Sequence, residues 1–64
     1  MLSFSEFHRA MLEGDPKVWQ HLDAMGRGTE GGFALKIRAA MELADMHNLK
    51  SLYEALPYLF QPKT

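Results

Sequence analysis

The chain has 64 residues, no cysteine, and seven Lys and Arg against eight Asp and Glu, so its formal net charge is −1. A chain of this length makes a single domain, residues 1–64, and leaves no room for a second. The near-neutral charge gives no overall attraction to nucleic acid or anionic membranes, and the lack of cysteine excludes disulfides and cysteine-bound zinc.

Residues 3–25 carry the signals of two consecutive helices. These are a capping box at Ser3 and Glu6, a left-handed glycine cap at Gly14, and an N-cap followed by a first-turn proline at Asp15 and Pro16. Apolar residues recur at helical spacing between these signals, as one face of each helix requires. We therefore expect an N-terminal helical pair whose second helix ends at Gly26.

A glycine-rich linker separates this pair from the rest of the chain. Residues 26–32 hold four of the five glycines. Their letters match the G-x-G-x-x-G pattern of dinucleotide-binding loops, but that motif needs a preceding strand, and a helix is expected there instead. We interpret the segment as a flexible linker.

The strongest helix signal runs from Phe33 to Met46, where ten of fourteen residues are apolar and neither Gly nor Pro occurs. At 100° per residue the apolar positions cover an arc of about 240°, much wider than the stripe that a surface helix buries. Two short helices could hardly cover this arc. The segment is therefore expected to be the central helix of the fold or part of a subunit interface.

A break is expected near His47 and Asn48, because the leucines from Leu49 onward would fall on the charged side of an unbroken helix. Asn also tolerates the left-handed conformation and can cap a following helix. A fourth short helix should then run to about Ala55. Since the residue before a proline disfavours the helical region, Pro57 should leave an irregular end.

These elements predict an all-α fold, a small bundle of three to four short helices. The single domain divides into the helical pair at 3–25, the linker at 26–32 and a C-terminal helical half at 33–60. A chain this short without disulfides needs an unusually apolar core or surface borrowed from a partner. We therefore expect the bundle to be dimeric.

No arrangement of residues predicts catalysis or a metal site. His8, His21 and His47 lie on different predicted elements, and none has a histidine or carboxylate partner at a metal-binding spacing. There is no cysteine nucleophile, and no serine sits in a nucleophile-elbow pattern. We predict a non-enzymatic protein with no cofactor and no bound metal.

The sequence carries no export or membrane signal. Its first residues lack the basic stretch and apolar run of a secretory signal, and no stretch of 18 apolar residues occurs. We expect a cytoplasmic protein that does not interact with membranes.

Residues 43–53 loosely resemble a helix-turn-helix, with the turn near Asn48. The residues that would contact DNA are Lys36, Arg38, Lys50 and Ser51. Two features depart from the motif, because His47 takes a position that is usually apolar and Pro57 shortens the second helix. A DNA-binding regulator is therefore the alternative function, and nucleic acid is the less favoured partner.

The apolar residues favour a protein–protein interaction function. Four methionines besides the first residue, and seven aromatic residues, exceed what one small core usually hides. For self-association as a homodimer we predict Phe33, Ile37, Met41 and Ala44. For contact with a protein partner we predict Trp19, Tyr58, Leu59 and Phe60. Such a chain suits a regulatory, adaptor or inhibitory accessory protein of the kind that phages and mobile elements encode.

Overall fold

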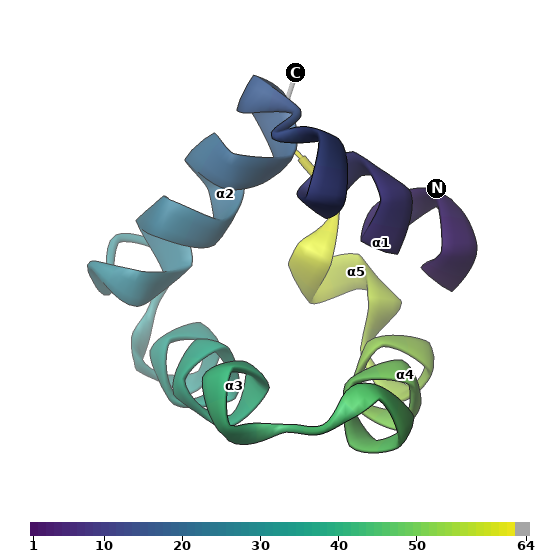
Figure 1. Ribbon diagram of the computed structural model, residues 1–64. Helices are drawn as coiled ribbons and strands as arrows, with labels where there is room; N and C mark the ends of the chain where they lie inside the picture. Colours follow the sequence, from purple (N-terminus) through teal and green to yellow (C-terminus); the bar gives the residue numbers. More distant parts are fainter. Residues whose placement is uncertain (63–64) are drawn as a thin grey trace.

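The computed structural model of the chain describes residues 1–62, which form five helices and no strand. The helices are α1 (Phe4–Glu13), α2 (Pro16–Gly26), α3 (Gly32–Leu43), α4 (Met46–Ala55) and the short α5 (Pro57–Phe60). The prediction of an all-α fold is confirmed, and the predicted number of three to four helices is corrected to five. Figure 1 shows α1 to α4 following one another around a ring, with α5 inside it.

The predicted boundaries of the first two helices are confirmed by their caps. The Ser3 hydroxyl accepts from the Glu6 N–H, and the Glu6 carboxylate accepts from the Ser3 N–H at 2.8 Å. This second contact holds the pKa of Glu6 below its usual value. Gly14 ends α1 at φ 75°, and the Asp15 carboxylate caps α2 through the Lys17 and Val18 N–H groups.

The expected break near His47 and Asn48 lies instead at Ala44 and Asp45. Both residues have extended backbone, and the Asp45 carboxylate accepts from the Asn48 N–H at 2.8 Å. Asn48 therefore belongs to the first turn of α4 and is not its cap. The apolar residues do change sides between α3 and α4, which requires a break. The residue that caps α4 after this break is Asp45, three positions before Asn48. The long helix consequently ends three residues earlier than expected, at Leu43 and not at Met46.

The core is formed by eight hydrophobic residues from all five helices, namely Phe7, Val18, Leu22, Met25, Ala34, Met41, Tyr53 and Phe60. Three aromatic rings lie at its centre. The ring centroid of Phe7 lies 4.6 Å from that of Tyr53 and 5.6 Å from that of Phe60, and the last two are 5.5 Å apart. Helix α3 packs chiefly on α2, whereas α4 packs on α1 and α5.

The chain after Pro57 is helical and partly buried, where an irregular end was expected. Pro57 occupies the first turn of α5, a position that needs no N–H donor, so the same proline that ends α4 starts a new helix. This turn places Phe60 in the core with no exposed surface.

A hydrogen-bonded clasp of Leu2, Tyr53 and Gln61 joins the two ends of the described chain. The Leu2 N–H donates to the Gln61 side-chain oxygen at 2.9 Å, and the Tyr53 hydroxyl donates to the Leu2 carbonyl. The Gln61 side-chain NH₂ donates to the Tyr53 hydroxyl at 2.7 Å and to the Pro57 carbonyl at 2.7 Å. The clasp therefore holds the segment before α1 against the segment after α5.

Within residues 1–62, no helix is both long enough and apolar enough to cross a membrane.

Candidate interaction site

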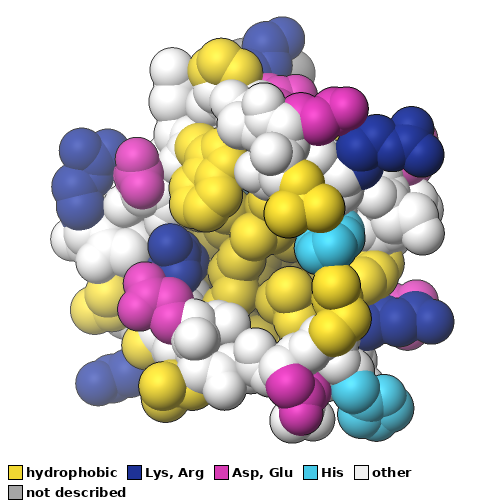
Figure 2. Space-filling model, viewed as in Figure 1, with side chains coloured by type: hydrophobic (Ala, Val, Ile, Leu, Met, Phe, Trp, Pro, Cys, Tyr) yellow, Lys and Arg dark blue, Asp and Glu magenta, His cyan; other side chains and the backbone are white. Residues whose placement is uncertain are grey.

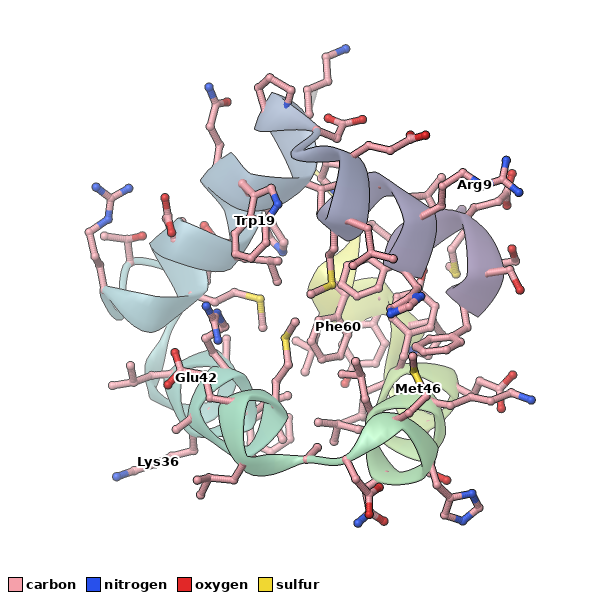
Figure 3. All side chains as sticks on the ribbon, in the orientation of Figure 1. Arg9, Trp19, Lys36, Glu42, Met46 and Phe60 are labelled. Carbon is pink, nitrogen blue, oxygen red and sulfur yellow. The ribbon has the colours of Figure 1, made fainter. Side chains whose placement is uncertain are left out.

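One face of the molecule carries a hydrophobic hollow. Figure 2 shows hydrophobic side chains both around and inside this hollow, which lies in the middle of the ring of helices seen in Figure 1. Trp19 of α2 and Met46 of α4 lie on opposite sides of the ring, and Phe60 lies near its centre (Figure 3). Because Phe60 is fully buried, it supports the face from beneath and contributes no surface to it.

Trp19 is held in place by a hydrogen bond and by the core. Its indole N–H donates to the Met11 carbonyl at 3.0 Å, and its half-buried ring packs against the core residues. Part of a large, rigid aromatic surface thus faces solvent at the hollow, with its polar atom already satisfied. Tryptophan is among the residue types that most often anchor protein interfaces.

Met46 gives the opposite side of the hollow a flexible side chain. It is 53% exposed. The methionines of α2 and α3, Met25 and Met41, are buried in the core and leave Met46 as the more exposed one. Because the unbranched thioether of Met46 adapts to different shapes, the hollow combines one rigid anchor with one adjustable side chain.

A second apolar surface is the outer face of α3, formed by the exposed residues Phe33, Lys36, Ala39, Ala40 and Leu43. Phe33 is 60% exposed and Leu43 is 90% exposed. This face arises because α3 packs on α2 through its other side, where Ala34 and Met41 are buried. Lys36 is its one charged residue and points outward (Figure 3).

Of the four residues predicted for self-association, only Phe33 lies on this outer face. Met41 is 7% exposed and belongs to the core, so its side chain serves packing within the monomer. Ile37 and Ala44 are half-buried, and Ile37 packs against the core. The exposed apolar surface of α3 is therefore rotated away from the predicted stripe, toward Leu43.

The four residues predicted for partner contact are divided between surface and core. Phe60 is fully buried because α5 turns it inward, so in this structure it offers no surface to a partner. Leu59 is half-buried against the core, and Tyr58 is 62% exposed. Trp19 is the member of this set that lies at the hollow.

The basic residues of the alternative DNA-binding hypothesis do not form one surface on α3. Lys36 and Arg38 are two positions apart, which directs them to opposite sides of the helix. Arg38 has a 15% exposed side chain and pairs with Glu42 at 2.9 Å. Lys50 and Ser51 are exposed on α4.

The two-residue connection between α3 and α4 is shorter than the usual turn of a helix-turn-helix, and α3 packs chiefly on α2. The geometry of these two helices therefore differs from that of the motif.

His21 has a structural role between α2 and α5. It is 8% exposed, and its Nε2 donates to the Leu59 carbonyl, which can only accept. It also borders a cavity of about 140 Å³, lined in addition by Lys17, Gln20, Ala24 and Glu30. Within residues 1–62 no three His, Cys, Asp or Glu side chains come together as a metal site would require.

Neither apolar surface follows from the sequence alone. Residue type favours Trp19 as an anchor, but its neighbours at the hollow come from other helices and are set by tertiary packing. Leu43 was included in the wide apolar arc, although periodicity alone could not show that α2 leaves it uncovered. The signal that could have found it is the excess width of that arc.

The chain matches no protein-family model, and it shows no significant similarity to a curated protein or to a solved structure. Its function has to be inferred from its own surfaces.

Proposed function

We propose that this chain has no chemistry of its own and acts in the cytoplasm as a small protein–protein interaction module, a regulatory, adaptor or inhibitory accessory protein that self-associates as a dimer. The observation that carries this proposal is the hydrophobic hollow beside Trp19 and Met46 (Figures 2 and 3). An apolar surface open to water is unfavourable unless a partner covers it. The anchored indole of Trp19 gives a partner a preformed contact.

The partner segment that best fits the hollow is the apolar side of an amphipathic helix from another protein. Such a helix presents side chains at i, i+3, i+4 and i+7 to an apolar groove between helices. The molecule measures 25 × 24 × 18 Å, so a segment of two to three helical turns, about 11 to 16 Å long, does not extend beyond it. The exposed Met46 side chain can adjust to anchors of different shape.

Trp19 makes this proposal directly measurable, because it is the chain's single tryptophan. A synthetic amphipathic helix with leucines at i, i+3, i+4 and i+7 and no tryptophan should change Trp19 fluorescence in a saturable way. Met46→Glu places a charge at the exposed side of the hollow and should weaken this binding at least about tenfold. Leu43→Glu, a change of the same kind on the outer face of α3, should bind like the unmodified chain.

Unchanged Trp19 emission across the titration, or equal binding by Met46→Glu, would contradict the proposal. The same protein should also be titrated with a nonspecific DNA duplex at low salt, where we expect no binding. Binding to the duplex that weakens steeply with added salt would instead favour the DNA-binding alternative through Lys36, Arg38, Lys50 and Ser51.

A further inference from the structure

We infer that the outer face of α3 is the dimer contact, and that its occupant is the α3 helix of a second copy running antiparallel to it. This inference rests on the proposed self-association and adds which surface makes it. Four of the five exposed residues on the face are apolar, and Phe33 and Leu43 are among the most exposed large hydrophobic residues of the described chain.

The spacing of residues along α3 makes this face complementary to itself. In an antiparallel pair related by a twofold axis beside residue 38, Phe33 of one copy lies opposite Leu43 of the other, and the reverse contact is made at the other end. Lys36 lies opposite Ala40 in the same register. The large side chains thus meet at the two ends, and Ala39 and Ala40 let the helices approach closely in the middle.

The single charge on the face also favours this arrangement. The last turn of α3 contains no basic residue, so nothing in its own sequence compensates the negative end of the helix dipole. In the antiparallel register, Lys36 leans toward the last turn of the other copy's α3, because helical side chains tilt toward their own N-terminus. Each lysine would therefore complement the other copy's helix end while its aliphatic stem covers an alanine.

The size of the face limits the area that the contact can bury. The described chain exposes 4254 Å², and a stable interface takes about 800 Å² from each partner. A helix of 12 residues is about 18 Å long and about 10 Å wide, so the α3 face supplies much less than this. We therefore expect a reversible dimer at high protein concentration, formed by monomers that are folded around their own core.

Sedimentation equilibrium over a range from micromolar to millimolar protein tests the contact. The apparent mass should rise from 7.3 kDa toward twice that value with concentration. Leu43→Glu and Phe33→Glu change exposed residues, so both should keep the helical circular dichroism spectrum while remaining monomeric. Leu12→Glu is the matched control, because Leu12 is 75% exposed on α1, across the ring from α3, and this variant should still dimerise.

Engineered cysteines test the antiparallel register, because the chain has none of its own. Across the twofold axis, two copies of residue 39 are offset by about 3 Å along the helices, whereas two copies of residue 33 are offset by about 15 Å. Under mild oxidation Ala39→Cys should therefore form a disulfide-linked dimer, and Phe33→Cys should not.

A chain that stays monomeric at every concentration would overturn self-association itself and leave the Trp19 response of the hollow unaffected. A dimer that persists in Leu43→Glu would overturn the choice of α3 but not self-association. Disulfide formation by Phe33→Cys as readily as by Ala39→Cys would overturn the antiparallel register.

Discussion

At the scale of single residues, Tyr53 performs two tasks with one side chain. Its ring stacks on Phe7, and its exposed fraction is only 2%. Its hydroxyl donates to the Leu2 carbonyl and accepts from the Gln61 amide. A buried phenol needs such partners, so the burial of Tyr53 is coupled to the position of both ends of the described chain.

Tyr53→Phe should therefore destabilise the protein although the ring is retained. The change leaves the Leu2 carbonyl and one amide hydrogen of Gln61 without their partner, which should lower the free energy of unfolding by about 1 to 3 kcal/mol in urea denaturation. Tyr58→Phe is the matched control, because Tyr58 is 62% exposed, and it should change stability by less than about 0.5 kcal/mol. Equal stability of the two variants would mean that the hydroxyl of Tyr53 does not hold the clasp.

At the scale of helices, a cap could be predicted where one residue favours the capping position. It could not be predicted where two nearby residues both favour it. Ser3 with Glu6, and Gly14 with Asp15, act within a few residues of each other, so the chain itself determines them. Between α3 and α4, Asp45 and Asn48 were both able to start a helix. The Asp45 carboxylate is the group that caps α4, and residue type alone does not choose between Asp and Asn, because both favour the N-cap position.

The two residues can be separated by mutation. Asp45→Ala removes the carboxylate that accepts from the Asn48 N–H and should lower the free energy of unfolding by about 1 kcal/mol. Asn48→Ala keeps that backbone donor and should cost less than about 0.5 kcal/mol. Chemical denaturation followed by circular dichroism measures both changes, and a larger loss in Asn48→Ala would place the start of α4 at the position first expected.

The wide apolar arc of α3 shows the corresponding limit for the candidate site. The sequence indicated that more apolar surface was present than two helices could cover. It could not show which part would stay uncovered. Met41 and Leu43 are both apolar, and they differ in that Met41 lies on the buried side of α3 and Leu43 on the exposed side. The existence of an exposed apolar face could thus be predicted, whereas its residues required the tertiary structure.

At the scale of the whole molecule, the shortest helix supplies a central core residue. Phe60 of α5 contacts the rings of both Phe7 and Tyr53, so α1, α4 and α5 meet at one aromatic cluster. The ring of helices seen in Figure 1 is therefore filled from within by a single turn of chain.

Phe60→Ala should unfold most of the protein. Removing a buried phenylalanine costs about 3 to 5 kcal/mol, and the total stability of a small domain is about 5 kcal/mol at the low end of the usual range. The helical circular dichroism signal at 25 °C should fall sharply, whereas Tyr58→Ala, on the same helix but exposed, should retain it. A folded Phe60→Ala variant would show that the ring of helices is stable without its centre.

The clasp of Leu2, Tyr53 and Gln61 also suggests that the fold does not require the helices to follow one another in their present order along the chain. Since the backbone of residue 2 lies within one side chain's length of residue 61, a short linker could join the two ends, and new ends could be opened in the largely exposed segment 27–31. Such a circular permutant would begin with α3 and finish with α2 while keeping every cap and core contact described above. The fold would then depend on the contacts that the helices make with the common core, and less on the order of the helices along the chain.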